Sequence, residues 1–213
     1  MHVRISQISL ARVVWLVEMF RMNPEGFALG PVHRGLIERY GFLNHPVPGP
    51  DSFNSTKGAI YKGGEFRFNE RSLAVDLTVY NDGLVVDSAT STAVSEAFLN
   101  DLAGWVTDSF GFRNPKELIK KPIYDSQLYF TSDIQLAQAT DKMSKFNNVL
   151  RDFTGNPTQE PWALLFQPDG APVAFSFERK ASTPFSERQY YSKAALPTDK
   201  HIELLEIFHE IFR

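Results

Sequence analysis

The stretch SLAVDLTVYNDGLVVDSATSTAVSEAF, residues 72–98, constrains the fold more than any other part of the chain. Apolar side chains at residues 73–80 alternate with smaller or polar ones, which is the period-two pattern of a half-buried strand. Asn81-Asp82-Gly83 then provides residues that tolerate positive φ, as a tight hairpin turn requires. The stretch therefore predicts an antiparallel hairpin, followed by a helix at about residues 94–110 whose apolar positions recur every three or four residues.

The rest of the chain gives the order αα-βββα-βα-βββα. We expect helices at residues 10–22, 31–40, 94–110, 141–153 and 198–213, and strands at 59–68, 73–80, 84–86, 122–133, 162–167, 171–180 and 186–194. Gly41 suits the left-handed position after a helix, and Gly63-Gly64 indicates a bulge or a close approach within its strand. Hairpins and meanders favour a mainly antiparallel sheet packed against helices, an α+β fold.

The domain boundary is predicted at residues 44–58, where three prolines stand among turn-forming residues. We expect a helical segment at 1–43, a linker at 44–58 and an α+β domain at 59–213. Residues 59–110 and 162–212 both read as βββα. Their hairpin turns occupy different places, so we interpret the likeness as coincidence or as a distant duplication.

Composition limits the class of protein. The 213 residues include 43% hydrophobic and 22% charged side chains, as in an ordinary globular protein, and 18 Phe that a core, pocket or interface must bury. The formal net charge of −3 argues against a broad nucleic-acid surface. Cysteine is absent, which excludes disulfides and thiolate chemistry and fits a cytoplasmic protein. The apolar run at residues 10–22 carries charges and is shorter than the ~20 residues of a membrane span, so we expect no membrane association.

Asp87 is the first candidate catalytic residue. The residues LTVYNDGLVVDSATSTAVSEAF resemble the signature of retroviral-type aspartic peptidases, in which a hairpin leads to Asp-Ser/Thr-Gly. Here Ala89 follows Ser88 directly, so the family's glycine is missing, and no second Asp-Ser/Thr-Gly offers a partner carboxylate. We therefore interpret Asp87 and the following hydroxyl residues as the end of the hairpin and a cap for the next helix.

A second candidate site lies in PDGAPVAFSFERK, residues 168–180. It resembles the Pro-Asp…Glu-x-Lys pattern of metal-dependent nucleases, with Asp169 and Glu178 as carboxylates and Lys180 beside them. A shared Mg²⁺ needs both carboxylates within ~2.5 Å of itself. The turn falls at Asp169 itself, and one extended strand would place Glu178 roughly 30 Å away, at ~3.3 Å for each residue.

Histidine and glycine patterns add little. Glu206 and His209 have the spacing that di-iron helix bundles use, but the chain lacks the further pair that such sites need. The other histidines show no ligand spacing, and no phosphate-binding glycine loop or nucleophile elbow occurs. We expect neither a bound metal nor another cofactor, while a serine triad assembled from distant residues stays possible.

The function expected from these observations is a non-enzymatic binding or assembly protein of a cytosolic complex. Phe53 in the Pro-rich stretch and the apolar face of the closing helix, Leu205, Phe208 and Phe212, are the expected contacts to a protein partner or to a second copy. One alternative is a nuclease that uses Asp169, Glu178 and Lys180. Another is a carrier of a small apolar ligand, because a sheet closed by an amphipathic helix can enclose an apolar pocket.

Overall fold

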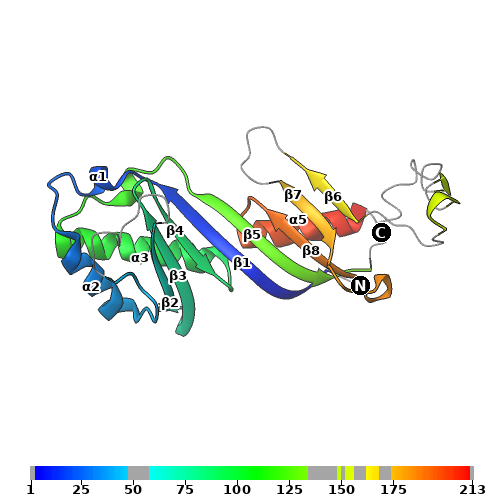
Figure 1. Cartoon of the computed structure of the whole chain (residues 1–213), viewed down its shortest axis with the longest axis horizontal. Helices are drawn as coiled ribbons and strands as arrows, with labels where there is room; N and C mark the ends of the chain where they lie inside the picture. Colours follow the sequence, from blue (N-terminus) through cyan, green and yellow to red (C-terminus); the bar gives the residue numbers. More distant parts are fainter. Residues whose placement is uncertain are drawn as a thin grey trace. The chain divides into compact units, whose positions relative to one another are not determined.

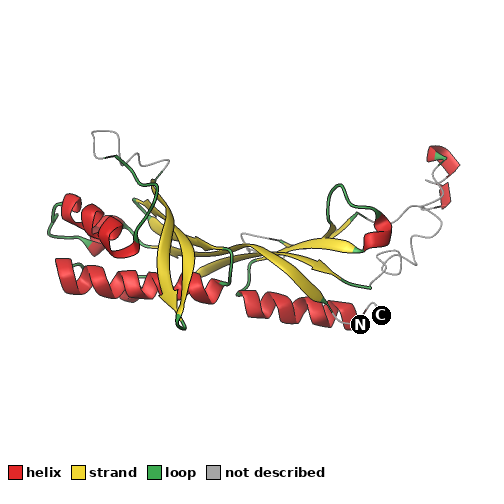
Figure 2. Ribbon diagram, turned by 90° about the horizontal axis from the view of Figure 1, so that it is seen from below, coloured by secondary structure: helices red, strands yellow, loops and turns green. Residues whose placement is uncertain are grey.

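The computed structural model describes residues 3–47, 58–133, 148–149, 152–155, 162–167 and 174–211. Its helices and strands form an α+β fold with one antiparallel sheet, as the sequence predicts (Figures 1 and 2). The strands are β1 (Arg4–Leu16), β2 (Ala59–Phe68), β3 (Arg71–Tyr80), β4 (Gly83–Ser88), β5 (Ile123–Thr131), β6 (Ala163–Phe166), β7 (Phe175–Arg179) and β8 (Gln189–Ala194). The helices are α1 (Met19–Met22), α2 (Leu29–Tyr40), α3 (Thr92–Phe110) and α5 (Thr198–Ile211), with 3₁₀ turns η1 (Pro115–Glu117) and η3 (Phe185–Glu187).

The strand order is β2-β3-β4-β1-β5-β8-β7-β6 (Figure 1). The order is symmetric about its middle. From one edge to the centre the strands are β2, β3, β4 and β1, and from the other edge to the centre they are β6, β7, β8 and β5. A helix follows each set of three strands, α3 after β4 and α5 after β8. The two βββα stretches seen in the sequence therefore also share one connectivity.

The helix predicted at residues 10–22 is wrong, and the chain begins with a strand. Ala11, Val13 and Trp15 of β1 are fully buried, and the residues between them are more exposed, so the true period is two. The apolar run hid this period because Val14 and Leu16 place apolar side chains on the other face as well, and periodicity alone does not separate a short buried strand from a buried helix. Only the four residues of α1 are helical.

The chain divides into two compact units. The larger unit consists of Leu10–Ser126 with Leu196–Thr198, and the smaller unit of Met1–Ser9, Gln127–Ala195 and Asp199–Arg213. Residues on both sides of the predicted linker at 44–58 belong to the larger unit, and positions 48–57 lie outside the described residues.

The core of the larger unit is formed by side chains of its strands and of the helices α2 and α3, and the two helices approach each other at Gly35 and Trp105 (Figure 1). Gly35 allows this approach, because a Cβ there would lie 2.7 Å from the indole of Trp105. The ring of Tyr40 packs on Phe98, with 4.7 Å between the ring centroids. Burial of such aromatic rings accounts for much of this unit's apolar area.

The bulge expected at Gly63-Gly64 is confirmed. The β2–β3 register shifts between Tyr61 and Gly64, and Gly63 adopts φ +68°. The ring of Phe42 packs so closely on Gly64 that it leaves no room for a Cβ. Gly41 ends α2 in the left-handed conformation, also as predicted.

The smaller unit has a core of its own. Strands β7 and β8 pair antiparallel, and α5 contributes side chains that pack against them. The buried residues of its core cluster are Leu128, Phe130, Phe177, Tyr190, Leu205 and Phe208. The closest aromatic contact of the helix joins Phe208 to Phe177, at 4.7 Å between ring centroids.

Candidate functional site

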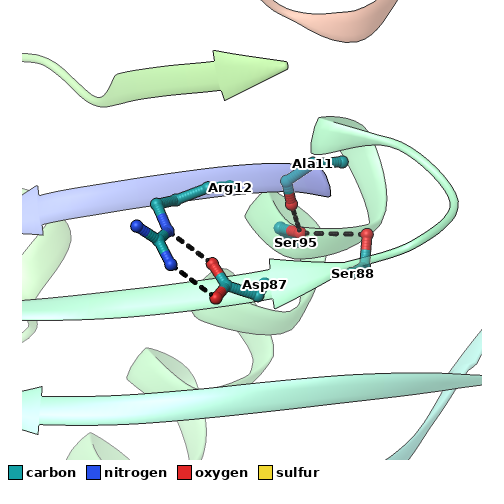
Figure 3. Close-up of polar contacts among 5 residues, drawn as sticks. All are labelled: Ala11, Arg12, Asp87, Ser88 and Ser95. Carbon is teal, nitrogen blue, oxygen red and sulfur yellow. Dashed lines mark hydrogen bonds and ion pairs between the residues drawn. The ribbon is translucent and has the colours of Figure 1, made fainter. Parts of the chain in front are cut away.

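Asp87 lies in β4, directly opposite Arg12 of β1. Arg12 Nε donates to Asp87 Oδ1 at 2.7 Å and Nη2 donates to Oδ2 at 2.8 Å, a two-pronged ion pair (Figure 3). The hydrogen bond to Asp87 raises the pKa of Arg12. Both oxygens of the carboxylate are therefore held by a permanent cation.

Asp76 of β3 faces Asp87 across the strand pair, so a second carboxylate does stand nearby. Its Oδ1 accepts the backbone N–H of Gly63 at 2.8 Å, within the bulge of β2. Each of the two acidic groups thus has a donor of its own. The geometry favours a structural row of charges over a proton-sharing pair of the aspartic-peptidase kind.

The hydroxyl residues that follow Asp87 do organise the start of α3. Ser91 is the N-cap and its side chain accepts the N–H of Val94 at 3.4 Å. Ser95 Oγ donates to the carbonyl of Ala11 at 2.7 Å and contacts Ser88 Oγ at 3.2 Å (Figure 3). The predicted cap is therefore formed by Ser91, whereas Asp87 belongs to the strand.

The nuclease residues are only partly described. Glu178 lies in β7 and Lys180 directly after it, where Lys180 Nζ donates to Gln189 Oε1 at 3.0 Å. Asp169 lies outside the described residues. Within the described part of the chain, no three His, Asp or Glu side chains are grouped so that they could hold a metal ion.

The expected partner-binding residues fall into two groups. Phe53 and Phe212 lie outside the described residues. Leu205 and Phe208 are buried in the core of the smaller unit, at 0% and 7% exposure. The exposed apolar side chains of α5 are Ile207 and Ile211, which the sequence reading did not single out.

An apolar cavity of about 140 Å³ lies in the larger unit, between the helices and the strands. Its wall consists of Met19, Met22, Leu29, Val32, His33, Leu36, Ala59, Tyr61, Leu77, Val79, Tyr80, Asn81, Leu84, Leu102, Ala103, Val106, Phe112 and Pro115. Leu29 and Asn81 are also exposed, so the wall reaches the protein surface there. Protein interiors rarely leave voids much larger than a water molecule, so the cavity is a distinctive feature.

A polar pair interrupts the apolar wall. His33 Nδ1 and the hydroxyl of Tyr61 are 2.9 Å apart, in a buried hydrogen bond. Burial raises the pKa of Tyr61 to about 12. Burial also lowers the pKa of His33, assisted by the nearby His45 and Arg34. Both groups are therefore neutral at neutral pH, and the cavity offers hydrogen-bonding atoms without a formal charge.

The cavity gave no signal in the sequence. His33 has no ligand spacing, and the other lining residues follow the ordinary apolar periodicity of helices and strands. The void depends on how α1, α2 and α3 lie over the strands, which no local pattern encodes.

The sequence matches no protein-family model and no curated protein. In the described part of the chain, no helix has the length and apolarity needed to cross a membrane.

Proposed function

We propose that the chain is a binding protein whose larger unit takes up a small, neutral, apolar molecule in the cavity. The observation that carries this proposal is the apolar wall around about 140 Å³. Apolar cavities of ~150 Å³ accept molecules of the size of benzene. The cavity is smaller than the ~300 Å³ or more of a drug-sized site, so the expected ligand is compact.

Energetics favour an occupant. When no ligand is bound, the apolar wall of the cavity faces empty space or water, and removing apolar surface from water contributes ~25 cal/mol for each Å². A ligand that fills the space restores dispersion contacts along the wall and stabilises the folded unit.

Thermal unfolding in the presence of small apolar probes tests the proposal. Benzene, toluene and indole at saturating concentration should raise the Tm of the protein, since a ligand at ~100 times its Kd adds ~2.7 kcal/mol. Native mass spectrometry of the freshly purified protein should show whether a compact molecule is retained. No Tm shift with any probe, together with a bare native mass, would contradict the proposal.

The variant Ala103→Leu tests the location of binding. Ala103 lines the cavity, so the added carbons should fill part of it, stabilise the free protein and abolish the probe-induced shift. Gly104→Ala is the matched control on the next residue of α3, because its Cβ meets nothing within 4 Å. A probe shift that survives unchanged in Ala103→Leu would place binding elsewhere.

A second candidate is the protein-binding role expected from the sequence. It is supported by large apolar side chains that stay exposed on the segment through α1 to the start of α2: Leu16, Phe20, Phe27 and Leu29. Such side chains mark interaction surfaces when they gather on one face. Sedimentation velocity should show self-association that Phe20→Ser weakens. A monomer at every concentration would remove the self-association part of this role.

The nuclease alternative stays a prediction, because it depends on Asp169. Cleavage of single-stranded DNA or RNA in Mg²⁺, lost in Glu178→Ala, would support it.

A further inference from the structure

The last turn of α5 brings His209 against the end of β5 in the smaller unit. Its Nδ1 is 3.0 Å from Ser132 Oγ, and its Nε2 is 3.3 Å from Asp133 Oδ1. Glu206, the neighbour that helical spacing suggested as its partner, is exposed, whereas His209 is 4% exposed. The imidazole of His209 therefore lies between the hydroxyl of Ser132 and the carboxylate of Asp133.

The contact between Ser132 and His209 allows either atom to donate. If the Ser132 hydroxyl donates to Nδ1, this nitrogen is unprotonated and the ring proton lies on Nε2, toward Asp133. The arrangement corresponds to that of a serine triad with the two ring nitrogens exchanged. The contact of Nε2 with Asp133 has the length of an ion pair but not the alignment of a hydrogen bond, and such contacts commonly tighten when a substrate binds.

Ser132 is 5% exposed and forms part of the wall of an open hollow. The hollow measures about 800 Å³ and is lined by Val3, Arg4, Thr131, Ser132, Asp133, Ser186, Glu187 and Arg188. Its volume is that of a small-molecule site. The wall carries two arginines, Arg4 and Arg188, and two carboxylates, Asp133 and Glu187; a carboxylate on the substrate would pair with a guanidinium group of this wall.

Arg188 ties the wall of the hollow to the candidate nucleophile. Its carbonyl accepts the N–H of Ser132 at 3.4 Å, and its Nη1 donates to the carbonyl of Asp133 at 3.4 Å. Arg188 adopts φ +50°, a conformation unusual for a residue with a side chain. Backbone held in such a conformation often occurs at functional sites.

We propose that Ser132 is the nucleophile of an ester-cleaving site, with His209 as general base and Asp133 as the residue that positions the imidazole. Ser132 Oγ bonds to the carbonyl carbon of a small anionic ester, and its proton passes to His209 Nδ1. The ester C–O bond then breaks, and the same proton leaves with the alkoxide as the alcohol. Water, deprotonated by His209, attacks the acyl-serine, releases the acid and restores the Ser132 hydroxyl. This activity is independent of the cavity in the larger unit.

A fluorophosphonate probe tests the nucleophile directly, because it forms a stable bond to an activated serine. The folded wild-type protein should be labelled at Ser132, located by peptide mass spectrometry, and Ser132→Ala should not. Ser186→Ala is the matched control, since Ser186 lines the same hollow, whereas the hydroxyl that meets His209 is that of Ser132. Absence of labelling in the folded wild type, or equal labelling of Ser132→Ala, would overturn the proposal.

The roles of Asp133 and Arg188 have separate readouts. Asp133→Asn should slow labelling at least ~10-fold without changing the Tm, while Asp133→Glu should restore part of the rate. An unchanged labelling rate in Asp133→Asn would refute the positioning role of Asp133.

4-Nitrophenyl hydrogen succinate should be hydrolysed with a lower KM than 4-nitrophenyl acetate, and Arg188→Gln should remove this difference in KM. Equal KM values in the wild type would overturn the preference for an anionic substrate.

Discussion

The imidazole of His33 and the phenol of Tyr61 meet at 2.9 Å on an otherwise apolar wall. Neither group is charged at neutral pH, since burial lowers the pKa of His33 and raises that of Tyr61. The pair joins α2 to β2 by a hydrogen bond at the cavity wall without the desolvation penalty of an ion.

The pair makes stability depend on pH. The pKa of His33 is lower in the folded chain than the ~6.5 of an unfolded histidine, so the unfolded state binds its proton first as the pH falls. The contribution of His33 to the free energy of unfolding is therefore fully present above about pH 6.5 and is lost as the pH falls below this value. Urea unfolding at pH 7.5, 6.5 and 5.5 should show this decline in the wild type and a shallower one in His33→Phe. An equal decline with pH in the wild type and in His33→Phe would mean that His33 has the same pKa in the folded and the unfolded state.

The hydroxyl of Tyr61 has a measurable share in this stability. Tyr61→Phe keeps the ring and removes the hydrogen bond to His33, which should lower the free energy of unfolding by ~1 kcal/mol. Urea unfolding at pH 7.5 measures the difference. An unchanged free energy of unfolding in Tyr61→Phe would show that the hydrogen bond to His33 is no stronger than the bond that the Tyr61 hydroxyl makes with water in the unfolded chain.

The Arg12–Asp87 pair should contribute little to stability in spite of its short distances. Both side chains are partly exposed, at 40% and 29%, so water screens the attraction. A double-mutant cycle with Arg12→Ala and Asp87→Ala should give a coupling of at most ~1 kcal/mol, decreasing with added salt. A coupling of several kcal/mol that salt does not change would instead indicate a desolvated pair.

Two helical glycines should respond to alanine in opposite directions. Gly35→Ala introduces a Cβ against the indole of Trp105 and should destabilise the larger unit by ~1–3 kcal/mol. Gly104→Ala meets open space within α3 and should stabilise it by ~0.5–1 kcal/mol, because alanine loses less backbone freedom than glycine. Thermal unfolding of the two variants under one condition compares them directly. A stabilising Gly35→Ala would mean that α2 and α3 can separate without loss.

Truncating a side chain on the buried face of α5 should cost more stability than truncating one on its exposed face. Phe208 is buried against Phe177, so Phe208→Ala should cost ~3–5 kcal/mol. Ile207 is 47% exposed, and Ile207→Ala should stay within ~0.5 kcal/mol of the wild type. Denaturant unfolding followed by circular dichroism measures both. Self-association through α5 should accordingly be tested at Ile207 and Ile211, since a charge at Phe208 would unfold the helix from its own sheet.

Local chemistry made much of the fold predictable. The Asn81-Asp82-Gly83 turn, Gly41 after α2 and the bulge at Gly63 depend on the conformations that a few adjacent residues allow. Strand β1 was missed because its apolar residues occupy both faces, which removes the alternation that identifies a strand.

The candidate sites were less predictable, since each depends on residues that are distant along the chain. His33 and Tyr61 come together only when α2 packs on β2. His209 suggested a helical pair with Glu206, but it meets Ser132 and Asp133, which follow strand β5 far earlier in the sequence. Spacing within one helix carries no information about a partner that another element supplies.

Strands β1 and β5 each contribute residues to both compact units: the smaller unit takes Met1–Ser9 from the start of the chain, while Leu10 onward belongs to the larger unit. A ribosome therefore delivers the first strand of the smaller unit long before the β5–β8 residues and α5 that complete it. During synthesis residues 1–9 are made before their partners in the smaller unit, and removing them should destabilise that unit.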